Sequence, residues 1–282
     1  MKPAYWYYGL VIIGLALLII SISHKKDFKL LVLSLVISDL LHAFEVFVLV
    51  VLPGYRYLPQ ILPDPGFDNL AGAYVSDYFI VPAFAVAINA FSLSWVSIAG
   101  IAAILTVTDW LFNNLGIYEH YWWNSLYTGI GLIILYAISK WIWQRLKKDR
   151  PSLLFRLAVV YLGFASIYSS IHFIFVGILQ LYRFHIGWLQ DPIWEHFLIA
   201  STYMHIVAAI VALSLGLKLG YRANILIVAL LAVFNWLLGY YNILVPFSGF
   251  APVFYTLIMV IAAAFLTCIF RLAKIGSWIK II

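Results

Sequence analysis

The sequence has little charge and almost no cysteine. Only 10% of its 282 residues are Asp, Glu, Lys or Arg, whereas soluble globular proteins carry about 25%. A single cysteine, Cys268, excludes an intramolecular disulfide and a cysteine-based metal cluster. The rest is rich in apolar side chains, since 65% of the residues are hydrophobic and 18% are aromatic. This composition excludes an ordinary soluble enzyme and is typical of an integral membrane protein.

Long apolar runs recur along the whole chain and leave no room for a sizeable soluble domain. Charged or turn-rich clusters separate nine runs of about 20 residues, the length that a helix needs to cross a bilayer. We therefore predict an all-α polytopic transmembrane helix bundle, in which residues 1–282 form a single integral membrane domain. The first run is expected to be a retained span, because no small-residue cleavage pattern follows it. The predicted spans are 4–23, 30–52, 70–90, 93–113, 122–144, 152–180, 192–216, 222–240 and 250–271.

Basic residues gather in alternate connections between these runs. Counting Lys140 and Arg156 with the loops that they adjoin, 14 of the 17 Lys and Arg residues lie in or beside SHKKDFK, RLKKDRP, KLGYR and RLAKIGSWIK. The positive-inside rule predicts an N-terminus outside the cell membrane and a cytoplasmic C-terminus. The formal net charge of +6 is spread over short loops rather than along one stripe. We therefore expect the lipid bilayer, and no nucleic acid, as a partner.

The stretch SDLLHAFEVF places three ionisable side chains inside an apolar run. Asp39, His42 and Glu45 are spaced i, i+3 and i+6, so a helix carries all three on one face. Each needs a polar partner or water, because burying a charge in hydrocarbon is costly. Other spans carry polar residues at midplane to outer depths, which predicts a polar cavity open to the outside. Its predicted lining residues are Asp39, His42, Glu45, Asp77, His172, Glu195, His205 and Asn235.

Each of these residues also has a structural interpretation. Asn235 fits a helix-packing hydrogen bond, and Glu195 fits a cap at the start of its helix. Asp109 and Glu119 lie near the outer ends of their helices and are expected to be satisfied at the surface. The alternative for the triplet in SDLLHAFEVF is a purely structural network between helices.

The polar cavity favours a transporter or permeation-type protein for a small solute or lipid-like molecule. Neighbouring Asp and His side chains would allow proton coupling. A first alternative is an intramembrane metal-dependent hydrolase with Zn²⁺ held by His42, His172 and His205, although no HExxH or HxxxH spacing is present. A second is a non-catalytic component of an envelope or spore assembly that acts through membrane protein partners. The sequence favours a non-enzyme, predicts no cofactor apart from the zinc alternative, and shows no clear internal repeat.

Two segments carry a resemblance to a known family. DNLAGAYVSDYFIVPAFAV holds a DYxxVP-like element, and TDWLFNNLGIYEHYWWNSLYTGIGL holds an acidic-Trp helix and a turn like YxxHWW. Between Asp68 and Trp143 the chain resembles a family of small, uncharacterised multi-pass membrane proteins of endospore-forming Gram-positive bacteria. The resemblance implies a bacterial cell membrane and brings no established activity or cofactor. The matching positions are Asp77, Pro82, Asp109, Glu119, His120, Trp122 and Trp123.

Overall fold

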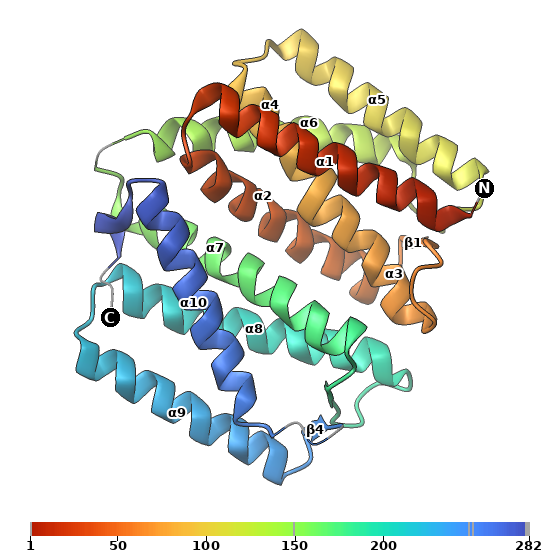
Figure 1. Cartoon of the computed structure of the whole chain (residues 1–282). Helices are drawn as coiled ribbons and strands as arrows, with labels where there is room; N and C mark the ends of the chain where they lie inside the picture. Colours follow the sequence, from red (N-terminus) through yellow and green to blue (C-terminus); the bar gives the residue numbers. More distant parts are fainter. Residues whose placement is uncertain (1, 149, 248, 250, 280–282) are drawn as a thin grey trace. The chain divides into compact units, whose positions relative to one another are not determined.

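The computed structural model describes residues 2–148, 150–247, 249 and 251–279, and helices dominate it (Figure 1). Within these residues, nine helical segments are long and apolar enough to cross a membrane. They confirm the predicted all-α class and the expected number of spans, while the sidedness of the chain stays a prediction. The segments are Pro3–Lys25, Lys29–Val51, Pro65–Ala90, Trp95–Asn114, Ser125–Leu146, Leu153–Ile178, Pro192–Gly216, Tyr221–Tyr240 and Phe254–Leu272.

The nine segments are assembled from α-helices and short π-helical segments. The α-helices are α1 (Pro3–Lys25), α2 (Lys29–Val46), α3 (Pro65–Tyr74), α4 (Val81–Ala90), α5 (Trp95–Asn114), α6 (Ser125–Leu146), α7 (Leu153–Phe173), α8 (Pro192–Gly216), α9 (Tyr221–Tyr240) and α10 (Phe254–Leu272). The π-helical segments are η1 (Phe47–Val51), η2 (Val75–Ile80) and η3 (Ile174–Ile178). Because η2 joins α3 to α4, these three form one span.

Contacts between elements divide the chain into two compact units, unit 1 (Met1–Arg150) and unit 2 (Pro151–Ile282). The division falls inside the single integral membrane domain expected from the sequence. In unit 1, α1 packs along α4, α2 packs along α4 and α6, and α5 pairs with α6. In unit 2, α7 packs along α8 and α10, and α9 packs along α10.

A two-stranded antiparallel ribbon joins loops in each unit. The strands are β1 (Tyr55–Tyr57) and β2 (Tyr118–His120) in unit 1, and β3 (Tyr182–Phe184) and β4 (Leu244–Pro246) in unit 2. In unit 1 Tyr57 pairs with Tyr118, and in unit 2 Phe184 pairs with Leu244. Each ribbon therefore ties the loop before one span to a loop more than 60 residues further along the chain.

Polar caps fix where several helices begin. In five helices the residue just before the first turn accepts hydrogen bonds through its side chain from backbone N–H groups of that turn, which otherwise lack partners. In α3 and α8 the capping Asp is followed by Pro, a residue suited to the first helical position. The capping residues are Asp64, Ser94, Asn124, Ser152 and Asp191.

The two units repeat one order of elements. Unit 1 runs α2, η1, β1, α3–η2–α4, α5, β2 and α6, and unit 2 runs α7, η3, β3, α8, α9, β4 and α10. The helix α1 precedes this pattern in unit 1. The π-helical segments η1 and η3 have the same length and the same place before the first strand of each unit. The chain therefore contains a tandem structural repeat.

Hydrogen bonds outside the helices follow the repeat residue by residue. The Tyr57 N–H donates to Asn69 Oδ1 at 2.8 Å, and the Phe184 N–H donates to His196 Nδ1 at 2.9 Å, both at a spacing of twelve residues. In both units the residue directly after the first strand donates its backbone N–H to a carbonyl in the loop between the second strand and the helix before it. These bonds join Leu58 to Ile117 at 3.0 Å and His185 to Ile243 at 2.8 Å.

The repeat escaped inspection of the sequence because few identical residues carry it. Tyr55 and Arg56 match Tyr182 and Arg183, and Asp64-Pro65 matches Asp191-Pro192. Elsewhere the same bond is made by different side chains, such as the amide of Asn69 and the imidazole of His196. The repeat is therefore visible in the backbone geometry rather than in residue identity.

Glycine allows α1 to approach η2 closely, and this makes a first prediction. A Cβ added at Gly14 would lie 2.5 Å from the carbonyl oxygen of Phe79, whereas one at Gly9 would meet nothing within 4 Å. We expect Gly14→Ala to lower the unfolding free energy by about 1–3 kcal/mol through overpacking. Gly9→Ala is the matched control and should raise it by up to about 1 kcal/mol. Unfolding by SDS in mixed micelles measures both, and equal effects would contradict the close packing.

Candidate ligand-binding site

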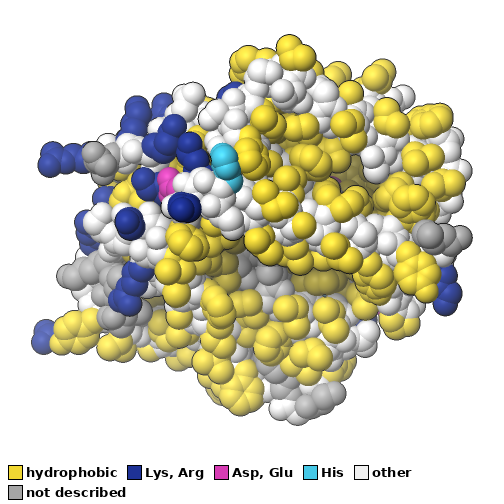
Figure 2. Space-filling model, turned by 45° about the horizontal axis from the view of Figure 1, so that its top comes forward, with side chains coloured by type: hydrophobic (Ala, Val, Ile, Leu, Met, Phe, Trp, Pro, Cys, Tyr) yellow, Lys and Arg dark blue, Asp and Glu magenta, His cyan; other side chains and the backbone are white. Residues whose placement is uncertain are grey.

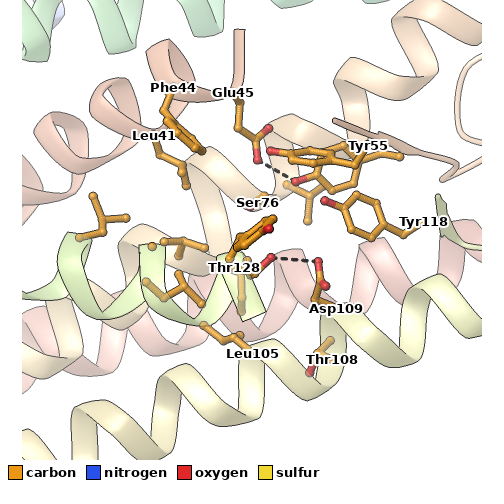
Figure 3. A pocket seen from close by; sticks show the side chains of 18 of the residues that line it. Leu41, Phe44, Glu45, Tyr55, Ser76, Leu105, Thr108, Asp109, Tyr118 and Thr128 are labelled. Atoms are coloured by element: carbon orange, nitrogen blue, oxygen red, sulfur yellow. Dashed lines mark hydrogen bonds between the residues drawn. The ribbon is translucent and has the colours of Figure 1, made fainter. Parts of the chain in front are cut away.

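Unit 1 encloses a cavity of about 560 Å³ between α2, α3–η2–α4, α5 and α6 (Figure 3). Its volume falls in the range of small-molecule sites. Apolar side chains of α6 line it over three turns, at Ile130, Ile134 and Ile138. These three and Phe44 of α2 are between 39% and 58% exposed. The rim of the cavity is therefore apolar and accessible, like most of the surface seen in Figure 2.

One part of the cavity wall is polar. The Tyr57 hydroxyl donates to Glu45 Oε1 at 2.7 Å, and the Thr128 hydroxyl donates to Asp109 Oδ1 at 3.4 Å (Figure 3). The ring of Tyr118 packs against that of Tyr57, with 4.8 Å between their centroids. Among the residues that line the cavity in the described part of unit 1, none is Lys or Arg. A ligand therefore meets carboxyl groups and no lysine or arginine among these lining residues.

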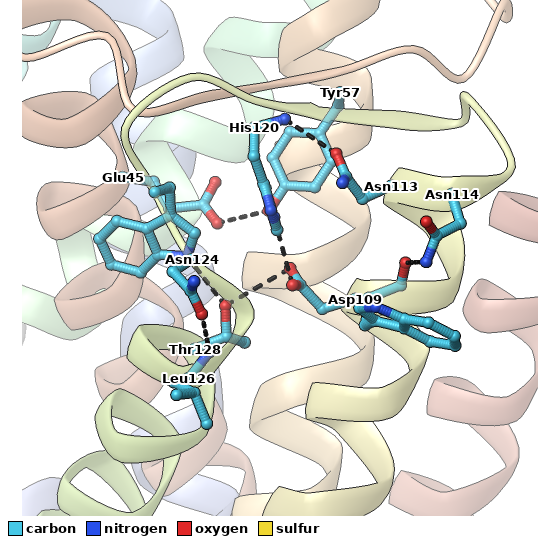
Figure 4. Close-up of polar contacts among 11 residues, drawn as sticks. Glu45, Tyr57, Asp109, Asn113, Asn114, His120, Asn124, Leu126 and Thr128 are labelled. Carbon is cyan, nitrogen blue, oxygen red and sulfur yellow. Dashed lines mark hydrogen bonds and ion pairs between the residues drawn. The ribbon is translucent and has the colours of Figure 1, made fainter.

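Neighbours from β2 and α6 fix the position of Asp109 (Figure 4). His120 Nε2 lies 3.2 Å from Asp109 Oδ2, and the backbone N–H of His120 donates to Asn113 Oδ1 at 3.0 Å. The Trp123 indole N–H donates to Thr128 Oγ1 at 2.9 Å, which orients the second partner of Asp109. Asp109 was expected at the surface. It lines the cavity instead, because the cavity reaches the last turns of α5.

The loop tyrosines beside Glu45 act as hydrogen-bond donors. Burial raises the pKa of Tyr55, Tyr57 and Tyr118 well above the usual value of a phenol, and the nearby Glu45 carboxyl adds to the rise. A raised pKa keeps each hydroxyl protonated through the physiological pH range. The polar wall therefore combines acidic groups with neutral hydroxyls.

Four ionisable residues of α2 and η2 form a buried cluster that reaches the cavity at Glu45. Asp39, His42, Glu45 and Asp77 are each at most 8% exposed. His42 Nδ1 lies 3.4 Å from Asp77 Oδ2, and Asp39 and Glu45 share the buried face of α2 with His42. Buried carboxyl groups beside an imidazole can exchange protons with it.

Unit 2 carries different side chains at the matched positions. His172 stands two residues before η3, as Glu45 stands two residues before η1. Asn235 and Asp109 each stand five residues before the end of their helices, α9 and α5. The Asn235 amide accepts a hydrogen bond from Tyr203 at 2.5 Å, and it donates one to a threonine hydroxyl of α10 at 2.8 Å. Acidic groups at these two positions are thus a property of unit 1.

The residues predicted to line a cavity are divided between the units. Asp39, His42, Glu45 and Asp77 come together in unit 1, and Glu45 among them lines the cavity. The other four lie in unit 2, so a single cavity lined by all eight stays a prediction. They are His172, Glu195, His205 and Asn235.

Each unit 2 residue of that set has a partner within its own unit. His172 Nδ1 lies 2.9 Å from the Tyr182 hydroxyl, and His205 Nδ1 lies 2.8 Å from the Tyr161 hydroxyl. Glu195 Oε2 lies 2.6 Å from His185 Nδ1, and Glu195 Oε1 accepts backbone N–H groups of the preceding loop. These contacts hold β3 and its loop onto α7 and α8.

The zinc alternative remains a prediction from the sequence. Its three histidines are divided between the units, with His42 in unit 1 and His172 and His205 in unit 2. Over the described residues, no group of three or more His, Cys, Asp and Glu is placed to hold a metal ion.

Comparison with known proteins adds no family to these observations. The chain matches no family model, no curated protein and no solved structure. The resemblance to membrane proteins of endospore-forming bacteria therefore stays a prediction from the motifs between Asp68 and Trp143. The function has to be argued from the geometry of the site.

Proposed function

We propose that the protein takes up a lipid-like molecule from the cell membrane into the cavity of unit 1, as the binding step of a transporter. The observation that carries this proposal is an apolar cavity of about 560 Å³ with carboxyl groups on one part of its wall. The exposed apolar rim on α2 and α6 supports access from hydrocarbon rather than from water. An apolar body fits the isoleucines of α6, and a polar group fits the wall at Glu45 and Asp109.

Proton exchange accompanies this binding step through Glu45. The carboxyl of Glu45 belongs both to the cavity wall and to the buried cluster with Asp77 and His42. Glu45 therefore places an acidic group at the boundary between the cavity and the buried cluster, where it can exchange a proton with a bound molecule. The hydrolase and envelope-component alternatives rest on sequence considerations, whereas the cavity favours binding of a lipid-like molecule.

Filling the cavity from α6 tests the proposal. Gly131 lines the cavity, and a Cβ added there meets nothing within 4 Å. Gly131→Phe should therefore place a ring in the cavity without displacing the backbone. We expect lipid extraction and mass spectrometry to find one molecule that co-purifies with the wild type in defined proportion, and at least about tenfold less of it with Gly131→Phe.

Gly100→Phe is the matched control. Gly100 is an exposed helical glycine of α5 outside the cavity, where an added Cβ also meets nothing within 4 Å. This variant should retain the co-purified molecule at the wild-type proportion. The same molecules in the same amounts from wild type and Gly131→Phe, with both proteins folded, would show that the cavity is not the binding site.

A further inference from the structure

Resting on the proposed function, we infer that the ligand of the unit 1 cavity is an apolar alcohol or phenol whose hydroxyl donates a hydrogen bond to Asp109. The inference comes from unit 2, where a side chain of the protein fills the matched space. That side chain is Tyr203, and its hydroxyl donates to Asn235 Oδ1 at 2.5 Å. In unit 1 the matched position is Ser76, a far smaller residue that lines the cavity.

Chain register establishes the match between Ser76 and Tyr203. Ser76 lies seven residues after Asn69, and Tyr203 lies seven residues after His196. Asn69 and His196 are themselves matched, because each accepts the N–H of the last residue of the first strand in its unit. Ser76 and Tyr203 also lie at the same distance along the chain from the capping Asp64 and Asp191.

The surroundings of Tyr203 confirm the match. Its ring packs against Phe184, Tyr255 and Phe234, with centroids 5.7, 5.5 and 6.1 Å away. Tyr57 and Thr108 hold the matched positions in β1 and α5, and both line the cavity. Tyr127 also lines it, and it precedes Thr128, which bonds Asp109 as Thr256, the residue after Tyr255, bonds Asn235. The space that the Tyr203 ring fills in unit 2 is therefore part of the ligand space in unit 1.

The hydrogen bonds around the two acceptors explain why a hydroxyl suits this space. Asn235 accepts from Tyr203 and donates through Nδ2 to Thr256 Oγ1 at 2.8 Å. Thr128, which occupies the place of Thr256, donates to Asp109 Oδ1 at 3.4 Å, and His120 Nε2 lies 3.2 Å from Asp109 Oδ2. Each carboxyl oxygen can accept two hydrogen bonds. The carboxylate keeps lone pairs for a further donor. A ligand hydroxyl occupies the place of the Tyr203 phenol and supplies that donor.

The rest of the wall sets the size and charge of the ligand. The isoleucines of α6 also line the cavity, whose volume of about 560 Å³ exceeds that of a tyrosine side chain, so the apolar body is larger than that side chain. Glu45 and Asp109 lie in the cavity wall, and among the described lining residues there is no Lys or Arg. A phosphate or carboxylate head group would therefore find no Lys or Arg to pair with there. The wall therefore selects a neutral hydroxyl.

The test uses para-nonylphenol and its methyl ether, which differ in whether the oxygen can donate a hydrogen bond. Binding to purified full-length protein in lipid nanodiscs is measured from the concentration-dependent rise in unfolding temperature. Gly131→Phe, in which a ring fills the cavity, shows how much of each compound only partitions into the lipid of the nanodisc. We expect the wild type to bind the phenol at least about tenfold more tightly than the ether, because only the phenol can donate a hydrogen bond to the Asp109 carboxyl.

Variants at Asp109 identify the acceptor. Asp109→Asn should keep the preference for the phenol, because an amide oxygen accepts as in unit 2, and Asp109→Val should bind phenol and ether equally. Unfolding without ligand shows that each variant is folded. The hydroxyl inference alone would be overturned if the wild type bound phenol and ether with equal affinity and Gly131→Phe bound neither. It would also be overturned if Asp109→Val still preferred the phenol. Undiminished binding of both ligands by Gly131→Phe would overturn the proposed function.

Discussion

Ser76→Tyr is expected to close the unit 1 cavity with a side chain that unit 2 already uses. The new ring would lie between Tyr57 and Tyr127, as Tyr203 lies between Phe184 and Tyr255. Its hydroxyl would donate to Asp109. We expect the co-purified molecule to fall at least about tenfold, while the unfolding free energy rises by about 0.5–2 kcal/mol because a cavity is filled.

Ser76→Ala is the control for this change. It removes the hydroxyl of Ser76 and leaves the cavity open, so the bound molecule should stay at the wild-type proportion. Mass spectrometry of lipid extracts and SDS unfolding are carried out on the same preparations. A folded Ser76→Tyr protein that retains all of its bound molecule would mean that Ser76 and Tyr203 do not occupy the same place in their units.

Asp68→Ala is expected to cost the most stability in unit 1. The Asp68 carboxyl accepts the backbone N–H groups of Gln60, Ile61 and Leu62 at 2.9, 2.6 and 2.8 Å, and the residue is 7% exposed. Its removal leaves three donors of the loop before α3 without a protein acceptor. Hydrogen bonds to a charged group are strong, so we expect the unfolding free energy to fall by about 3 kcal/mol.

Asp64→Ala is the comparison, since Asp64 lies one helical turn earlier. Its carboxylate accepts the N–H groups of Gly66 and Phe67 at the start of α3, at 3.0 and 3.1 Å. Loss of such a cap costs about 1 kcal/mol. The two variants are compared by SDS unfolding in mixed micelles. A smaller loss for Asp68→Ala than for Asp64→Ala would show that the loop does not depend on this carboxylate.

The spans could be predicted from the sequence because their signal is local. An apolar run long enough to cross a bilayer can be recognised from its own residues alone. In the described part of the chain, each of the nine expected runs corresponds to a helical segment long enough to cross a membrane. The face shared by Asp39, His42 and Glu45 is likewise a property of one helix. All three are buried, and Glu45 among them lines the cavity.

The rest of the site could not be predicted, because it depends on pairs of distant residues. Asp109 sits near a helix end, where a carboxylate is usually exposed, and only its contacts with His120 and Thr128 show otherwise. The apolar character of the cavity depends on Ser76, whose small size has meaning only beside Tyr203. Polar residues in an apolar run can be recognised as candidate site residues from the sequence. A small residue at a position where the other unit has an aromatic one cannot be recognised in that way.

The segment η2 marks a one-residue difference between matched spans of the two units. The span Pro65–Ala90 has 26 residues and its partner Pro192–Gly216 has 25, and only the longer one contains a π-helical segment. One inserted residue turns the following helix by about 100° relative to the preceding one. The part of the longer span that follows η2 therefore presents a different set of side chains to its neighbours than the matched part of α8 does.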